Sequence, residues 1–118
     1  MKKLFLLSIL ILFTQFLFAQ SIPLDSITNY VGKTVTVCAQ VQSAFIGKGD
    51  QKPTYLSFGK PFPDATLTVV IFENDLPNFN YKPVEFLQNK NICITGKVKL
   101  FKNNTQIIVS TEDQIKIK

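Results

Sequence analysis

The sequence predicts a small all-β domain, a five-stranded Greek-key barrel with one short helix between its third and fourth strands. Two alternating segments, "KTVTVCAQV" from residue 33 and "NICITGKVKL" from residue 91, carry nearly the same pattern of apolar residues. Strict alternation of apolar and polar residues is typical of a half-buried strand. One segment, 83–90, begins with a proline and has the character of a two-turn helix instead. This order of elements predicts a barrel in which the first and fourth strands enter the same closed sheet.

Residues 1–19 are expected to form a secretory signal peptide. Lys2 and Lys3 precede an apolar run from Leu4 to Phe18, and Ala19 offers a small residue at which cleavage would occur. The run is shorter than the about 20 residues that a bilayer span needs, although a retained membrane anchor is the alternative. No cysteine follows the run closely, which argues against a lipoprotein anchor. We therefore expect an exported protein, periplasmic or secreted, with no stable membrane anchor.

Residues 20–118 are expected to form a single domain, which is enough chain for one hydrophobic core. Without Lys2 and Lys3, 11 of the 13 basic residues remain against 8 acidic residues, so the net charge falls from +5 to +3. Every basic residue is lysine, and the chain has no histidine. Bidentate phosphate recognition normally uses arginine, and a general base near neutral pH is normally histidine. We expect no metal, no cofactor and no catalytic site.

The remaining elements are bounded by residues that favour turns. The segments "IGKGDQKPT" and "KPFPDA" contain the glycines and prolines that end the first two strands. "TLTVVIF" is apolar on both faces at its end, as in a central strand, and "KNNT" predicts a tight hairpin whose asparagines tolerate positive φ. We expect a helical turn within 21–31, the helix at 83–90, and strands at 34–44, 55–59, 66–72, 92–101 and 105–110.

The apolar pattern shared by "KTVTVCAQV" and "NICITGKVKL" aligns four positions of the first predicted strand with four of the fourth. Apolar residues recur in both, so Val37 and Ile94 are expected to face the barrel interior. Ala39 and Gly96 occupy equivalent positions, and a small residue there would let a strongly coiled strand bend. Chance similarity between two alternating strands is the alternative explanation.

The two cysteines, Cys38 and Cys93, are each out of phase with the apolar residues of their strands. Alternation places them on the opposite face, where neighbouring strands in an oxidising compartment would allow a disulfide. Two small buried thiols are the alternative. A Cys/His zinc site is excluded because the chain has no histidine.

Three strands, a helix and two further strands are the order of the OB-fold. The segments "GKTVTVCAQV", "TYLSFGKPFPDATLTVVIF" and "NICITGKVKLFKNNTQIIVSTEDQI" resemble bacterial OB-fold nucleic-acid-binding domains of the tRNA-anticodon-binding type, in their exported single-domain form. The resemblance extends over residues 30–117. It implies a nucleic-acid-binding fold with no catalysis of its own. The chain departs from that pattern at Ala39, where glycine is usual, and in lacking arginine and tryptophan on the binding strands.

OB-folds bind oligonucleotides across strands two and three and through the loops that join strands one to two and four to five. Tyr55 alternates with Leu56 and is expected to face outward. Lysines beside exposed aromatic rings suit single strands, since the charge contacts the backbone and the rings stack on bases. The predicted binding residues are Lys48, Lys52, Tyr55, Lys99, Phe101 and Lys102. Four other phenylalanines are expected in the core or as plugs at the barrel ends: Phe45, Phe58, Phe62 and Phe72.

The leading functional hypothesis is a non-catalytic, exported protein that binds single-stranded DNA or RNA weakly. The alternative is an envelope interaction or stress protein that uses the barrel to hold a protein, a small ligand or a cation, because fold does not determine function. An enzyme is not expected, since the acidic residues show no paired spacing and no general base is present.

Overall fold

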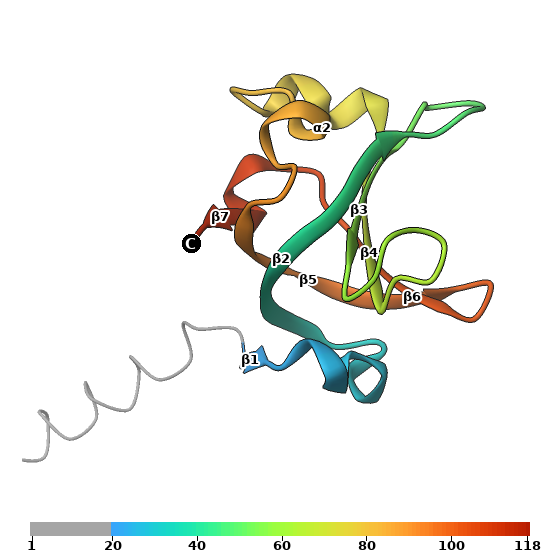
Figure 1. The fold of residues 1–118 in the computed structure, drawn as a ribbon, viewed down its shortest axis with the longest axis vertical. Coiled ribbons are helices and arrows are strands. Elements are labelled where there is room, and N and C mark those ends of the chain that lie inside the picture. The colour runs from blue at the N-terminus through green and yellow to red at the C-terminus, as the bar shows by residue number, and fades with distance from the viewer. Residues whose placement is uncertain (1–19) are drawn as a thin grey trace, which may run out of the picture.

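Five strands of the computed structural model, which describes residues 20–118, pair in a closed ring (Figure 1). The pairs β2–β3, β3–β4, β5–β6 and β2–β5 are antiparallel, and β4–β6 is parallel. This Greek-key ring is the OB-fold that the strand order predicts. The expected signal peptide lies outside the described residues. The ring consists of β2 (Thr34–Ile46), β3 (Thr54–Phe58), β4 (Leu67–Ile71), β5 (Asn91–Phe101) and β6 (Asn104–Ile108).

Two short strands extend the sheet beyond the five that were predicted. β1 (Gln20–Ile22) pairs in parallel with β2, and β7 (Ile115–Ile117) pairs antiparallel to β5. Each has only three residues, too few to show an alternating pattern in the sequence. The described elements also include three 3₁₀ helices: η2 (Leu24–Tyr30), η3 (Glu73–Asn78) and η4 (Glu112–Gln114). η2 confirms the helical turn expected within 21–31.

The helix before β5 is shorter than predicted. α2 (Pro83–Phe86) is a single turn with proline at its start, whereas the sequence predicted a helix over 83–90. Asn89 has a φ of 62°, a left-handed conformation that interrupts a right-handed helix. The chain therefore turns towards β5 at Asn89 instead of completing a second helical turn.

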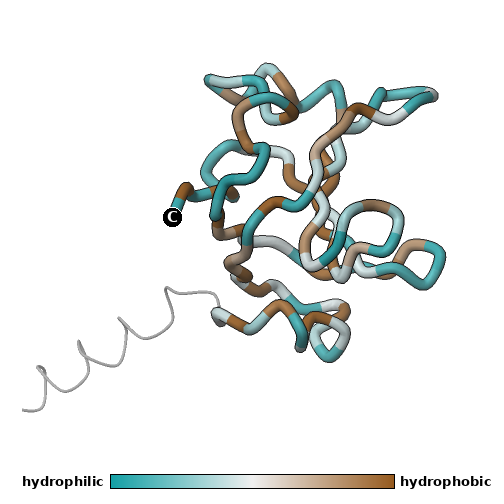
Figure 2. The backbone as a smooth tube through the Cα atoms, in the orientation of Figure 1, coloured by the Kyte–Doolittle hydropathy of each residue, from teal (hydrophilic) through white to brown (hydrophobic). Residues whose placement is uncertain are grey.

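The hydrophobic core is formed by the inward rows of the barrel strands. Val37 and Ile94 lie opposite each other in the register, and both side chains are 0% exposed, as the sequence predicted. β4 lies between β3 and β6, which confirms that it is a central strand. Hydrophilic residues gather at the loop tips, including the tip of the β5–β6 hairpin (Figure 2).

The apolar pattern that β2 and β5 share is explained by the direct pairing of these two strands. Seven residue pairs join these strands, and Gly96 lies opposite Val35. A Cβ atom at Gly96 would lie 2.5 Å from Cγ2 of Ile107, so the small residue permits the close approach of β6. The irregularity of β2 lies between Val41 and Ser43, not at Ala39, and the strand continues past the predicted end to Ile46. The pairing of β2 is therefore regular at Ala39 and interrupted by a β-bulge further along the strand.

The cysteines form the disulfide Cys38–Cys93. They lie directly opposite each other on β2 and β5, with Cα atoms 3.9 Å apart. Their side chains are on the face opposite the core, beside a hydrogen bond of 2.7 Å between the hydroxyls of Thr36 and Thr95. The bond thus lies across the strand pair that closes the ring.

The β5–β6 hairpin has the predicted position but a different turn. Lys102 and Asn103 have positive φ values of 50° and 65°, and Asn104 already belongs to β6. The sequence had assigned the positive φ to the two asparagines. A lysine therefore occupies the apex of the turn, where its side chain is exposed.

Replacing Ile94 with alanine tests the phase of the core. The change should lower the free energy of unfolding by about 2–5 kcal/mol, because it leaves a cavity in a fully buried position. Lys97→Ala, an exposed change on the same strand, is the matched control and should change stability by less than about 0.5 kcal/mol. Urea unfolding measures both. If Ile94→Ala and Lys97→Ala lowered the free energy of unfolding equally, the assignment of Ile94 to the inward row of its strand would be wrong.

The disulfide should be visible as an intact mass lower than that of the reduced chain by two hydrogen atoms. Replacing both Cys38 and Cys93 with serine should lower the free energy of unfolding by about 2–5 kcal/mol, as loss of a native disulfide does in small exported domains. Thermal melts with and without reductant provide the control, because the double variant should not respond to reductant. If reductant left the melting temperature of the wild-type protein unchanged, the disulfide would not contribute to the stability of the fold.

Candidate nucleic-acid interface

The outer face of the barrel carries a row of side chains across β2, β3 and β4. Tyr55 lies opposite Phe45 on β2 and opposite Val70 on β4. Leu56, the next residue of β3, is fully buried in the core. Alternation therefore directs Tyr55 away from the core, as predicted.

Three aromatic rings form a cluster on this face. The ring centroid of Phe45 lies 5.3 Å from that of Tyr55 and 5.0 Å from that of Phe62. The rings of Tyr55 and Phe62 are stacked, with centroids 6.1 Å apart. Phe62 is 52% exposed, so its ring faces solvent.

The expectation that four phenylalanines lie in the core or plug the barrel ends is confirmed only for Phe58, which is fully buried. Phe62 is exposed in the loop between β3 and β4, while Phe45 and Phe72 are half-buried at the outer face. The β-bulge explains why Phe45 lies on the outer face. One extra residue between Val41 and Ser43 reverses the phase of β2, so a position that would have faced inward faces outward.

A hollow of about 480 Å³ lies beside the cluster. Four aromatic rings line it, from β3, the β3–β4 loop, the end of β4 and β5, together with polar side chains from β4 and β6. It brings Tyr55 together with Phe101 and Lys102, three of the predicted binding residues. Phe62, Phe72 and Gln106 also line the hollow and were not among the predicted binding residues. Phe72 shares the strand phase of Val70 and could have been found from alternation, whereas Phe62 lies in a proline-rich loop with no periodicity.

Two of the four predicted lysines lie beside this hollow. Nζ of Lys102 is 5.4 Å from the ring centroid of Phe101, and Lys99 is paired in the register with Gln106, which lines the hollow. Lys48 and Lys52 do not line it. They are exposed in the β2–β3 loop, which lies at the opposite end of this face from the β5–β6 hairpin (Figure 1).

The base of the β2–β3 loop packs against the aromatic cluster. A Cβ atom at Gly47 would lie 2.5 Å from Cε2 of Tyr55, so the loop backbone approaches the ring closely. Beneath the rings, the hydroxyls of Ser43 and Ser57 form a hydrogen bond, and the backbone N–H of Phe62 donates to Oγ of Ser43 at 3.4 Å. These contacts hold the loops on both sides of Tyr55 against the same sheet face.

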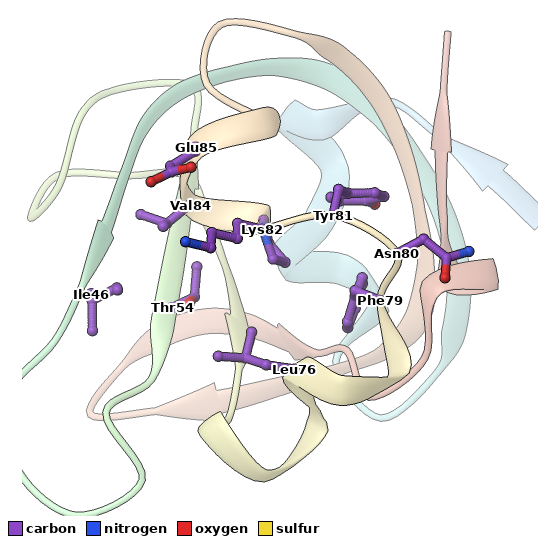
Figure 3. A pocket seen from close by; sticks show the side chains of 10 residues that line it. Ile46, Thr54, Leu76, Phe79, Asn80, Tyr81, Lys82, Val84 and Glu85 are labelled. Atoms are coloured by element: carbon purple, nitrogen blue, oxygen red, sulfur yellow. The ribbon is translucent and has the colours of Figure 1, made fainter.

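A second cavity of about 580 Å³ lies at the end of the barrel, beneath η3 and α2 (Figure 3). Its wall from residues 79 to 82 is held in place by η4, since the backbone N–H of Asn80 donates to Oε1 of Glu112 at 2.6 Å. Asn78 also donates from Nδ2 to the carbonyl of Ser110 at 2.8 Å. Burial, and secondarily the charge of Glu112, raise the pKa of Tyr81 above its ordinary value of 10.0.

Neither a cluster of metal ligands nor a membrane-spanning helix is found in the described part of the chain. Residues 20–118 contain no group of three or more His, Cys, Asp or Glu side chains that could hold a metal ion. Within the same residues, no helix has both the length and the apolar character needed to cross a bilayer.

The closed ring and the aromatic outer face define an OB-fold domain. No protein-family model and no curated protein matches the chain. Among solved structures, an OBody bound to hen egg-white lysozyme is similar, with 21% identity, a TM-score of 0.59, and coverage of 83% of this chain and 90% of that one.

Two natural proteins have the same fold in part. The aspartyl-tRNA synthetase of Entamoeba histolytica is 19% identical with a TM-score of 0.52, and the match covers 84% of this chain and 21% of that chain. The Stn1–Ten1 complex of S. pombe is 14% identical with a TM-score of 0.53, covering 72% of this chain and 57% of that one. The chain thus spans about a fifth of the synthetase. At these identities the similarity shows the fold.

The pKa of Tyr81 can be measured by absorbance titration. Subtracting the curve of Tyr81→Phe from that of the wild type should leave an ionisation step centred above pH 10, because burial favours the neutral phenol. A phenol whose pKa is higher in the folded state stabilises the fold below pH 10, and this contribution is lost as the pH rises through the folded pKa. Stability should therefore fall less steeply above pH 10 in Tyr81→Phe. A step at or below pH 10 would contradict the assignment.

Proposed function

We propose that residues 20–118 bind single-stranded nucleic acid, DNA or RNA, without catalysing a reaction on it. The observation that carries this proposal is the cluster of solvent-facing rings on the outer sheet face, with lysines in the loops at both of its ends. Bases would stack on the rings while the lysines contact the phosphates. The described geometry supports binding by stacking and charge, the two contributions on which sequence-tolerant single-strand binding depends.

The stacking surface is formed by Tyr55, Phe62 and Phe101. Phe62 and Phe101 are 52% and 58% exposed, so each presents a ring to solvent that a base can cover. Stacking of a base on an aromatic side chain contributes about 1–3 kcal/mol. Two or three such contacts would be sufficient for weak binding without recognition of base edges.

The positive charge on this side of the molecule comes from lysines, and Asp50 in the β2–β3 loop partly offsets it. Lys48 and Lys52 lie in the β2–β3 loop, and Lys99 and Lys102 lie at the β5–β6 hairpin (Figure 1). A lysine ammonium contacts phosphate as a point charge, whereas the bidentate contacts that read guanine normally require arginine. We therefore propose binding that is weak, dependent on salt and tolerant of sequence.

The similar structures offer limited support for this class of partner. One of them is an aspartyl-tRNA synthetase, an enzyme whose substrate is an RNA. The OBody, in contrast, is bound to a protein. The fold is thus compatible with both kinds of partner, and the lysines beside the rings favour nucleic acid here.

We also propose that the protein acts outside the cytoplasm. Residues 1–19 have the composition of a signal peptide, and the Cys38–Cys93 bond suits an oxidising compartment such as the periplasm or the cell exterior. A nucleic-acid ligand there would be extracellular or released DNA or RNA.

The second candidate is binding of a protein in the cell envelope through the same face. It is favoured by the apolar character of the hollow, in which four aromatic rings and Val70 form much of the wall. Apolar rings without flanking charge would be sufficient for such a partner. Dependence of binding on salt distinguishes the two candidates.

Fluorescence anisotropy with a labelled oligonucleotide, measured across a salt series, tests the leading candidate. The log–log slope of affinity against salt should be about −0.7 per phosphate neutralised on a single strand. Four lysines in two loops are expected to engage two to four phosphates, which gives a slope between about −1.4 and −2.8. The absence of binding at low salt would rule out the nucleic-acid candidate and favour a protein partner.

Variants separate the two contributions to binding. Replacing Lys99 and Lys102 with glutamine should flatten the slope, whereas Tyr55→Ala or Phe101→Ala should weaken binding with an unchanged slope. Lys116→Gln with Lys118→Gln is the matched control, because this pair lies at β7 on the other side of the barrel (Figure 1). If the control pair flattened the slope equally, the binding face would be assigned wrongly.

A further inference from the structure

The end of the barrel beneath η3 and α2, a helix of a single turn, contains a cavity. Phe79 and Leu87 are buried in the core, but neither fills the space between the covering segment and the ends of β2 and β3. The resulting cavity has a volume of about 580 Å³. Sites for small molecules are typically about 300–1,000 Å³. The space is therefore of the size that one small ligand requires.

The cavity has an aromatic side and an aliphatic side. Phe79 and Tyr81, whose ring centroids are 5.8 Å apart, lie on one side, and Ile46 and Val84 lie on the other (Figure 3). Leu76 lies between them at the base (Figure 3). A planar ring fits such a space, because it contacts other rings at one side and branched aliphatic groups at the opposite side.

The charged groups at the cavity balance each other. Lys82 and Glu85 are both exposed and are the two charged residues among those that line it. The other lining residues are apolar or neutral, and Thr54 contributes a hydroxyl group from β3. An ionic ligand would lose hydration here without gaining a net opposite charge, so a neutral ligand is favoured.

This cavity is separate from the face that carries Tyr55. Ile46 and Thr54 are opposite each other at the ends of β2 and β3, one position beyond the pair Phe45 and Tyr55. Alternation directs the two pairs to opposite sides of the same ribbon. Occupation of one side therefore does not require occupation of the other, and the inference is independent of nucleic-acid binding.

We propose that the cavity at the barrel end binds a neutral, planar aromatic molecule. Its ring lies between the side chains of Phe79 and Tyr81 and those of Ile46 and Val84. The rim is open to solvent, since Ile46 is 53% exposed, so a small molecule enters without unfolding of α2.

Titration of the isotope-labelled protein with acetophenone, followed by amide chemical shifts, tests the proposal. Saturable shifts are expected at Ile46, Leu76, Phe79 and Val84. Benzoate and benzylammonium, which are similar in size but charged, should bind about tenfold more weakly or not at all. Binding of either ion as tight as that of acetophenone would overturn the neutral class, and the absence of saturable shifts with acetophenone would overturn the site.

Variants whose larger side chains fill the cavity test whether acetophenone binds there. Ile46→Trp and Val84→Trp should each weaken acetophenone binding about tenfold or more. If Val84→Trp fails to fold, Ile46→Trp decides alone, because its position is largely exposed and tolerates a larger side chain. Phe101→Ala, on the other face, is the control and should leave acetophenone binding unchanged. Unchanged binding in folded Ile46→Trp, or equal loss in Phe101→Ala, would overturn the proposed location.

Discussion

The antiparallel pairing of β2 with β5 is the contact on which the structure depends, because it joins the two ends of the strand order β2-β3-β4-β6-β5. Without it the sheet would be open, with two unpaired edges that invite association with other chains. The Cys38–Cys93 bond makes this closure covalent. Gly96 contributes in another way, since the absence of a side chain there lets Ile107 pack against the closing strands. The hydrophobic interior exists only because the ring is closed at this place.

Both candidate binding regions depend on the same two strands. β2 continues beyond the part that closes the ring and, with β3, forms a ribbon whose two sides differ. One side carries Phe45 and Tyr55 towards the loops that hold the lysines, and the other carries Ile46 and Thr54 towards the open end of the barrel. A rigid ribbon that is anchored by a closed ring can hold two separate surfaces with no contribution from a second domain. The short α2 matters for one of them, because a longer helix would cover the barrel end.

Local patterns predicted the strand order, the central position of β4 and the inward rows that include Val37 and Ile94, because alternation reports directly on burial. β1 and β7 could not be predicted, since their pairing depends on neighbours distant in sequence. The site was predicted in part. Tyr55 follows from its strand phase, but Phe62 is brought beside it by a loop conformation that no local pattern encodes. Features made by distant segments, such as the cavity between β2, β3 and the covering helices, require the fold itself.

The register shift between Val41 and Ser43 has a consequence for how proteins of this kind diverge. Deleting the extra residue at the bulge would leave Phe45 outward and Ile46 inward, whereas deleting Ala44 beyond it would turn Phe45 towards the interior and Ile46 towards the lysine-bearing side. Strand length is thus inherited as a trait distinct from residue identity. Two descendants that keep every aromatic residue would present different surfaces if one had lost the extra residue and the other had lost Ala44. A comparison that scores substitutions alone would treat them as equivalent, whereas the placement of the gap would reveal the change.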